Sequence, residues 1–149
     1  MTEKKPFTEW DVSLCADFIK SFEGERLKAY QCSAGVWTVG VGHTEGVKPG
    51  DEITTEESNA LFLADLYYFK RRVAPLVEVD VTEGQFVALM SFVFNVGVNA
   101  FMTSTLRKRL NEGNLTQASF EFLKWKFVGG EIVKGLLKRR QAERELFNK

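Results

Sequence analysis

The chain has 149 residues, 44% of them hydrophobic, which is enough for one compact domain with a buried core. Its 20 basic and 20 acidic side chains cancel, so the composition excludes broad electrostatic attraction to nucleic acid or to an anionic membrane. Two cysteines do not make a disulfide framework, and neither an export signal nor a long uncharged apolar stretch is visible. We therefore expect a cytoplasmic setting with reduced thiols and no membrane segment in this chain.

The first predicted helix ends at an acidic residue. Thr8 and Asp11 approximate a capping box that opens it. Apolar residues then recur at the spacing of one helix face: Cys15, Phe18, Ile19 and Phe22. Glu23 closes this pattern, and Gly24 follows where a helix would stop. A carboxylate at that edge can face a cleft.

A β-hairpin rich in glycine is predicted directly after this helix. The pattern indicates a strand, a turn and a second strand, at residues 27–31, 32–35 and 36–42. Gly40 and Gly42 in the second strand allow another group to approach the backbone closely. Residues 45–53 are rich in turn-forming residues and can close a small sheet.

A long helix is predicted next. Thr54 and Glu57 form a capping box, and the helical pattern continues over residues 55–75. One face of this helix carries Leu61, Ala64 and Tyr68. About 20 residues at about 1.5 Å each give a helix about 30 Å long, which is long enough to join two lobes.

The following helix is predicted to form the centre of the larger lobe. Thr82 and Gln85 make a third capping signature, and the residues after them are apolar nearly all round the helix. Asn95 interrupts this apolar surface just before Gly97. Its amide therefore either satisfies buried backbone groups or faces the cleft.

The C-terminal third is also predicted to be helical. Shorter helices are expected at residues 104–110 and 115–127, and the glycine pair at residues 129–130 breaks the chain. On the closing helix, Arg139 is spaced to pair with Glu143. A solvated closing helix would account for most of its charges.

The spacing around Glu23 resembles the catalytic segment of bacteriophage-type lysozymes, glycoside hydrolase family 24. Cys32 follows Glu23 by nine residues, Thr38 comes six residues later, and a Gly-x-Gly-His-Thr motif occupies residues 40–44. An aromatic-Asn-x-Gly motif at Asn95 is similar to a second family motif. The family's C-terminal signature is similar to the Gly-Gly, Gly-Leu, Arg-Arg and Glu of the last stretch, so the resemblance covers about residues 18–147.

This resemblance implies an α+β, mostly α, phage-lysozyme-like fold. A small β-hairpin lobe and a larger helical lobe would be joined by the long helix. The chain, residues 1–149, would form a single lysozyme-like domain, with the β lobe at about residues 24–53. The helical lobe would comprise about residues 76–149 plus the N-terminal helix.

The resemblance also implies catalytic roles. Glu23 matches the general acid of the family, and Thr38 matches the threonine near the attacking water. Cys32 occupies the position of the family's second catalytic group, an aspartate. A thiol with a reference pKa of about 8.5 is mostly neutral near pH 7, so glycosidic cleavage should be weakened. A thiolate is a good nucleophile, however, and the acid is retained.

Other positions match the family in supporting roles. The residues implied to hold the glycan are Asn95, Ser104 and Thr105. His43 matches a structural histidine at the end of a strand. A C-terminal arginine should lie near Glu23, and both Arg139 and Arg140 are candidates. No metal or cofactor is implied.

Three functional hypotheses follow. The first is a muramidase that acts on the β-1,4 bond between N-acetylmuramic acid and N-acetylglucosamine in peptidoglycan, attenuated by Cys32 and used within a bacterial scaffold. Similarity to muramidase-like domains of polar scaffolds implies a sensor histidine kinase and a polar organising protein as partners, and an anchor outside this segment. The second is a fully active phage endolysin. The third is an inactive protein-interaction domain, for which Trp10 and Trp37 offer an apolar surface unless they fill the core, as aromatic residues ordinarily do.

Overall fold

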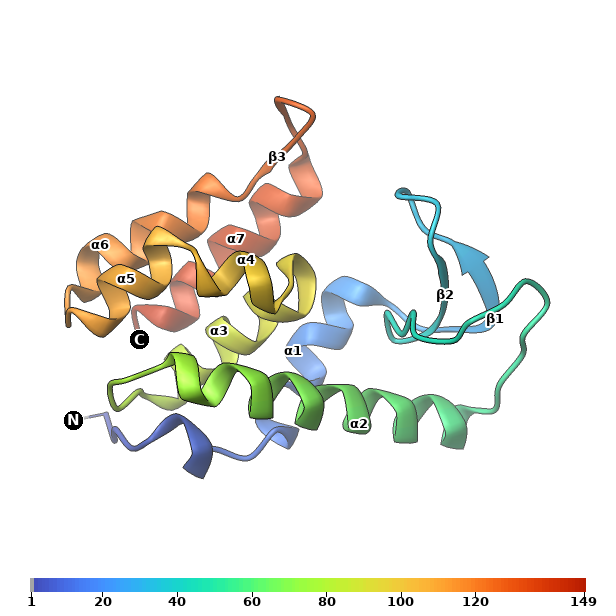
Figure 1. Cartoon of the computed structure of the whole chain (residues 1–149), viewed down its shortest axis with the longest axis horizontal. Helices are drawn as coiled ribbons and strands as arrows, with labels where there is room; N and C mark the ends of the chain where they lie inside the picture. The colour runs from blue at the N-terminus through green and yellow to red at the C-terminus, as the bar shows by residue number, and fades with distance from the viewer. Residues whose placement is uncertain (1) are drawn as a thin grey trace.

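The structure, a computed structural model, describes residues 2–149. A helical body and a smaller β lobe project from a shared base, along which one long helix runs (Figure 1). The helices are α1 (Ser13–Glu23), α2 (Thr55–Val73), α3 (Glu83–Val96), α4 (Val98–Met102), α5 (Thr105–Asn111), α6 (Leu115–Glu121) and α7 (Lys134–Phe147). The strands are β1 (Arg26–Gln31), β2 (Trp37–Gly40), β3 (Phe127–Val128) and β4 (Glu131–Ile132). The mostly helical fold with a small β lobe is confirmed.

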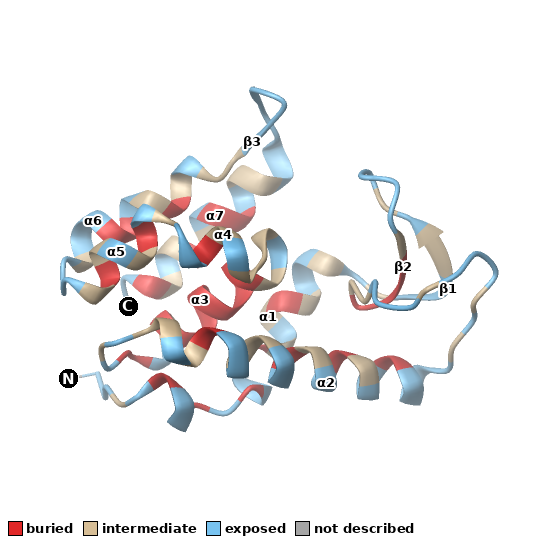
Figure 2. Cartoon of the chain, viewed as in Figure 1, coloured by how far each residue is buried: buried red, intermediate tan, exposed pale blue. Residues whose placement is uncertain are grey.

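Helix α3 is the centre of the helical lobe, as its all-round apolar sequence predicts. Every side chain of α3 from position 85 to position 93 is buried, and α7, α1 and α2 pack around it (Figure 2). Gly84 permits this packing, because a Cβ at that position would collide with the carbonyl oxygen of Leu146 near the end of α7. Burying each large apolar side chain contributes roughly 1.5–3 kcal/mol, so α3 is the main source of cohesion for the lobe.

The β lobe is a short antiparallel hairpin supported by a third segment. Strands β1 and β2 pair with Tyr30 opposite Thr38 and with an irregularity nearer their other end. Ala29 N donates to Asp51 O at 2.8 Å, and Ile53 N donates to Leu27 O at 2.9 Å, so the predicted turn-rich segment does close the sheet. The second strand ends earlier than predicted, at position 40.

Two capping predictions are confirmed and one is wrong. Thr54 caps α2 and Thr82 caps α3, each with the reciprocal side-chain bond that completes a capping box. Thr8 does not cap α1, because it lies within a 3-10 turn, Phe7–Glu9, and the helix begins only at position 13. There Asp11 Oδ1 accepts a hydrogen bond from Ser13 N at 2.8 Å.

The chain after α5 departs most from the sequence-based expectation. The helix expected to reach position 127 ends at Glu121 and continues only as a 3-10 turn, Phe122–Lys124. A second hairpin, β3–β4, follows with its turn at the glycine pair, and it projects away from the helical body (Figure 1). The β structure is therefore not limited to the predicted β lobe.

For Trp10, the structure confirms core filling rather than an exposed apolar surface. Its side chain is only 7% exposed, its Nε1 donates to Val81 O at 3.0 Å, and its ring stacks against Phe86. Trp37 is half-buried. Trp10 thus belongs to the core and offers no surface to a partner.

Candidate active site

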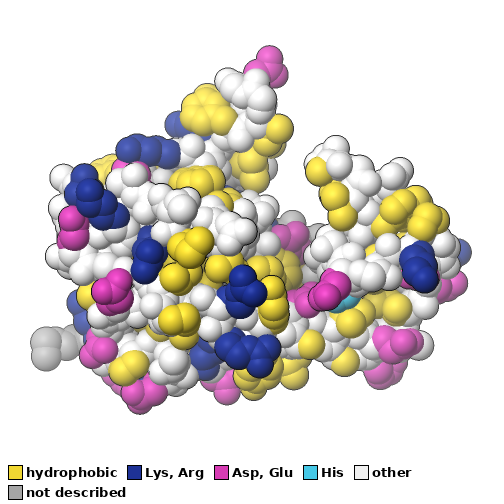
Figure 3. All heavy atoms as spheres, viewed as in Figure 1, with side chains coloured by type: hydrophobic (Ala, Val, Ile, Leu, Met, Phe, Trp, Pro, Cys, Tyr) yellow, Lys and Arg dark blue, Asp and Glu magenta, His cyan; other side chains and the backbone are white. Residues whose placement is uncertain are grey.

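A cleft of about 860 Å³ lies where the two lobes meet. The hollow between the two projecting arms is visible on the face shown in Figure 3. Helix α1 contributes Glu23, the β hairpin contributes Tyr30, Cys32 and Thr38, and the end of α3 contributes Asn95. The predicted face of α2 forms part of the floor: Leu61, Ala64 and Tyr68.

Glu23 is the last residue of α1, and its carboxyl group lies in the cleft. The helix ends there because Gly24 adopts a φ of 69°, which glycine tolerates better than other residues. Arg139 Nη1 donates to Glu23 Oε1 at 2.8 Å. A Cβ at Gly42 would lie 3.3 Å from Glu23 Oε2, so glycine there lets the hairpin approach the carboxylate.

The two candidate arginines have different positions. Arg139 contacts Glu23 and is only 4% exposed. Arg140 is completely buried, points to Glu143, and places its guanidinium 5.0 Å from the ring centroid of Phe92. Arg139 is therefore the arginine at the site, and Arg140 belongs to the core.

The predicted pairing of Arg139 with Glu143 is present, but it is buried rather than solvated. Arg139 Nε lies 3.4 Å from Glu143 Oε2, and Glu143 is 0% exposed. Arg140 Nε lies 2.6 Å from Glu143 Oε1, close enough for an ion pair but not aligned as a hydrogen bond. Burial raises the pKa of Glu143, while Arg140, the Ser91 hydroxyl and Arg139 oppose that shift.

Cys32 occupies the first position of the hairpin turn. Its carbonyl oxygen accepts a hydrogen bond from Gly35 N at 2.8 Å, and its side chain is partly exposed in the cleft. The backbone N–H groups of Val36 and Ala34, with a smaller contribution from the Thr38 hydroxyl, lower the pKa of the Cys32 thiol. This surrounding favours the thiolate, the form that reacts.

Thr38 lies beside Cys32 on the second strand. It is 3% exposed, and its hydroxyl donates to Val36 O at 3.0 Å. The oxygen retains lone pairs through which it can accept a hydrogen bond from a water molecule. Thr38 is thus placed in the cleft with Glu23 and Cys32, as the spacing of the three residues suggests.

The two thiols should react at very different pH values. The lowered pKa predicts that iodoacetamide labels Cys32 at a lower pH than an unperturbed cysteine, because thiolate accumulates as pH rises through the pKa. Cys15 is buried, and burial raises its pKa to about 12, so it should stay unlabelled until the protein unfolds. Mass spectrometry of labelling rates against pH, with an unstructured cysteine peptide as reference, tests this. A Cys32 midpoint at or above that of the peptide contradicts the prediction.

His43 is held by both ring nitrogens. Nδ1 lies 2.8 Å from Asp65 Oδ2, and Nε2 lies 3.0 Å from Glu45 O. These contacts tie the end of the hairpin to helix α2. Although His43 lines the cleft, both of its nitrogens are engaged, which fits a structural role.

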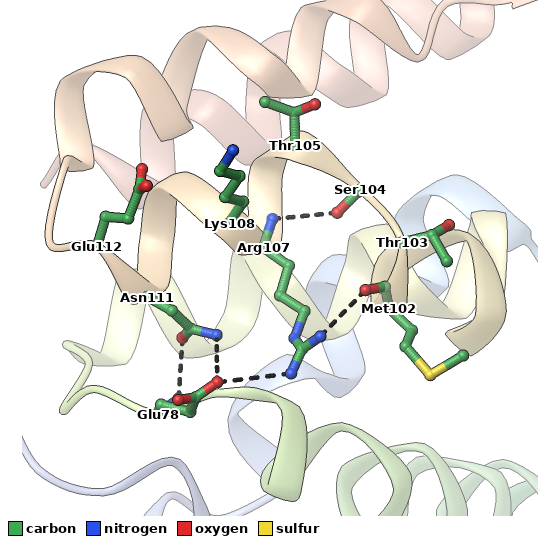
Figure 4. A pocket seen from close by; sticks show the side chains of 9 residues that line it. All are labelled: Glu78, Met102, Thr103, Ser104, Thr105, Arg107, Lys108, Asn111 and Glu112. Atoms are coloured by element: carbon green, nitrogen blue, oxygen red, sulfur yellow. Dashed lines mark hydrogen bonds and ion pairs between the residues drawn. The ribbon is translucent and has the colours of Figure 1, made fainter.

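The three expected glycan-binding residues are not brought together. Asn95 is exposed and lines the cleft with Glu23. Ser104 and Thr105 line two shallower depressions of the helical lobe, one of which is drawn in Figure 4. Ser104 caps α5 by accepting a hydrogen bond from Arg107 N at 3.0 Å. Their contact with a glycan stays a prediction.

Two residues around the site were missed from the sequence. Asp65 bonds His43, and Ser91 Oγ accepts a hydrogen bond from Arg139 Nε at 3.3 Å. Ser91 did carry a signal, because it interrupts an otherwise apolar helix. Asp65 also had a recognisable sequence signal, because it lies one helical turn from Leu61 on the cleft face of α2.

The fold and this cleft, with a helix-end glutamate facing a β hairpin, define a lysozyme-type protein. The chain belongs to the phage lysozyme family, which matches residues 20–143. It is of the muramidase-like peptidoglycan hydrolase type. In residues 2–149, no helix combines the length and the apolarity needed to cross a bilayer.

Individual relatives agree with this family. The chain is 47% identical over 133 residues to the endolysin of Acyrthosiphon pisum secondary endosymbiont phage 1, covering 87% of this chain and 91% of the relative. It is 46% identical over 134 residues to the endolysin of Bacillus phage B103, covering 88% of this chain but only 51% of that relative. The muramidase domain of SpmX from Asticaccaulis excentricus superposes with a TM-score of 0.81 at 38% identity, covering 93% and 94% of the two chains.

Proposed function

We propose that this domain cleaves the β-1,4 bond between N-acetylmuramic acid and N-acetylglucosamine in peptidoglycan, with Glu23 as the general acid. The observation that carries this proposal is the placement of the Glu23 carboxyl group. It lies in a cleft that Cys32 and Thr38 also line, and it is held by a hydrogen bond of 2.8 Å from Arg139. No metal or cofactor is required for this chemistry.

In the proposed reaction, the proton of Glu23 passes to the glycosidic oxygen as the bond from that oxygen to the sugar carbon breaks. The oxygen of a water molecule attacks the same carbon, and the thiolate of Cys32 accepts the proton that this water releases. Thr38 orients the water through its hydroxyl oxygen. Arg139 stabilises the negative charge that forms on Glu23.

Cys32 makes the proposed activity weaker than that of an enzyme with aspartate at this position. A carboxylate is fully ionised near pH 7, whereas a thiol is ionised only in part, because reference pKa values are about 3.9 and about 8.5. The backbone donors around Cys32 lower its pKa and so reduce this handicap. We therefore propose attenuated rather than absent cleavage.

Asn95 is the proposed glycan ligand within the cleft. It is exposed at the end of α3, and its side-chain amide can both donate to and accept from sugar hydroxyls. Ser104 is the half-buried N-cap of α5 and Thr105 is its exposed first residue, and both lie outside the cleft lining. We propose that they contact the glycan only where it extends beyond the cleft.

Digestion of purified peptidoglycan by the purified domain tests this function. We expect soluble muropeptides with N-acetylmuramic acid at the reducing end, identified by mass spectrometry after borohydride reduction. N-acetylglucosamine at the reducing end would show that the domain cleaves the other glycosidic bond of the glycan strand. Intact sacculi after prolonged incubation would contradict hydrolysis.

A second candidate is a role within a bacterial scaffold, with a sensor histidine kinase and a polar organising protein as partners and a cytoplasmic location. The likeness to the SpmX muramidase domain favours it. The β3–β4 hairpin also favours it, because it exposes apolar side chains: Phe127, Val128 and Ile132 are 49%, 62% and 56% exposed.

The localisation of the partner proteins in cells that carry Glu23→Gln tests the scaffold role. Unchanged localisation would support this candidate, whereas lost localisation would tie the role to cleavage. Phage lysis is the competing use of the same chemistry.

A further inference from the structure

The arginine that holds Glu23 is itself held by a second, buried glutamate. Glu143 is 0% exposed and does not line the cleft. Its Oε2 accepts from the Ser91 hydroxyl at 2.6 Å and from Arg139 Nε at 3.4 Å. In residues 2–149, Glu23 and Glu143 are the carboxylates that contact Arg139.

The guanidinium group of Arg139 has one side that bonds the core and one side that bonds Glu23. Nε donates to Ser91 Oγ at 3.3 Å, and Nη2 donates to Ser91 O at 3.0 Å. Nη1 is left for Glu23. A guanidinium is planar and rigid, so anchoring Nε and Nη2 fixes the direction in which Nη1 points.

Glu143 also neutralises the charges of two buried arginines. Arg139 and Arg140 follow each other in α7, and both are buried. Glu143 is the negative group between them, at 3.4 Å from Arg139 Nε and 3.0 Å from Arg140 Nη2. Without it, the two guanidinium groups would repel each other, and the core-facing side of Arg139 would keep only its neutral Ser91 partners.

We propose that Glu143, assisted by Ser91, is a positioning residue of this site: it orients Arg139 so that one N–H group holds the carboxyl group of Glu23 in the cleft. This inference rests on the proposed hydrolysis. Glu143 does not line the cleft, so the proposed role is exerted through Arg139.

Steady-state kinetics of Glu143→Gln test the proposal. The substitution keeps the shape of the side chain and removes its charge. We expect kcat to fall by about 10- to 100-fold while KM stays within about twofold, because a displaced catalytic group affects the chemical step more than binding. Glu121→Gln is the matched control, since Glu121 pairs with Lys124 in the same lobe and has no contact with Arg139. The control should keep the wild-type kcat.

A double-mutant cycle separates positioning from a merely structural role. If Glu143 acts through Arg139, the double variant Glu143→Gln with Arg139→Lys should be no slower than Arg139→Lys alone. Effects on kcat that multiply, or an unchanged kcat in folded Glu143→Gln, would overturn the proposal. Should Glu143→Gln fail to fold, Ser91→Ala replaces it in the same cycle, with a smaller loss of kcat expected.

A measurement without substrate keeps this inference distinct from the proposed hydrolysis. In ¹⁵N NMR spectra, the Nη signals of Arg139 should be resolved in the wild type, because its guanidinium is anchored and rotates slowly. They should merge in Glu143→Gln and stay resolved in Glu121→Gln. Resolved signals in a wild-type protein that fails to digest peptidoglycan would reject the hydrolysis alone, whereas unchanged signals in Glu143→Gln would reject the positioning role.

Discussion

Glu23→Gln is expected to lower peptidoglycan hydrolysis by about 100- to 10,000-fold, the range that one positioned acid or base contributes. This loss corresponds to roughly 3–5 kcal/mol of activation free energy. Glutamine keeps the length of the side chain and can still accept from Arg139 Nη1, but it has no proton to give to the leaving oxygen. Turbidity of a cell-wall suspension, with release of reducing ends, measures the loss.

Glu25→Gln is the control for this experiment. Glu25 lies two residues away but bonds the Ser58 hydroxyl at 2.6 Å and does not line the cleft. The Ser58 hydrogen bond lowers the pKa of Glu25, which suits a structural carboxylate rather than a proton donor. We expect hydrolysis by Glu25→Gln to stay within about threefold of the wild type. Equal losses in both variants, or none in Glu23→Gln, would mean that the acid has been misassigned.

Folding of the two variants should be compared before their rates. Glutamine at position 23 keeps an acceptor for Arg139 Nη1, and the buried guanidinium also keeps Glu143 and Ser91 as partners, so it is not left unpaired. We therefore expect thermal unfolding of Glu23→Gln within a few degrees of the wild type. A normal melting temperature together with lost hydrolysis would locate the effect in the chemistry.

The fold could be predicted from the sequence wherever a local signal and the tertiary structure agree. The capping boxes at Thr54 and Thr82 fix the starts of α2 and α3, because the reciprocal side-chain bonds depend only on residues three apart. Thr8 fails as a cap although its spacing is similar. Its neighbour Phe7 is 2% exposed and packs against Phe86, so burial of that ring determines the local backbone there.

The β3–β4 hairpin could not be predicted from periodicity. Its strands are two residues each, and Phe127, Val128 and Ile132 are all exposed, so there is no alternation between a core face and a solvent face. The glycine pair at its turn was recognised only as a break. A glycine pair between two short apolar runs is the signal that would have indicated a hairpin.

The site shows the same division between local and tertiary information. The positions of Glu23, Cys32 and Thr38 follow from a helix end and one hairpin, so their common cleft could be anticipated from spacing. The sequence spacing could not show whether Arg139 or Arg140 contacts Glu23. Adjacent residues on a helix differ by about 100° in direction, and only the packing of α7 on α3 determines which one faces Glu23.

Cys32→Asp is expected to raise hydrolysis, and the structure explains why aspartate should be accepted. Position 32 is the first residue of a turn closed by Gly35 N, a position that favours aspartate. The same N–H groups of Val36 and Ala34 that lower the thiol pKa would donate to a carboxylate. The partly exposed side chain has room for the change.

The gain should depend on pH in a defined direction. Aspartate is ionised above about pH 4. The Cys32 thiol ionises only as pH rises towards its own pKa, which the backbone N–H groups of Val36 and Ala34 lower. We therefore expect a gain of about 10-fold or more near pH 6 that shrinks as pH increases and the wild-type thiolate accumulates. Cys32→Ser, which is similar in size but does not ionise in this range, is the control and should be slower than the wild type at every pH. An aspartate variant that folds but gains no activity even near pH 6 would contradict the prediction. Ionisation at position 32 would then not limit the reaction. The shape of the cleft around Glu23 would become the better explanation for weak cleavage.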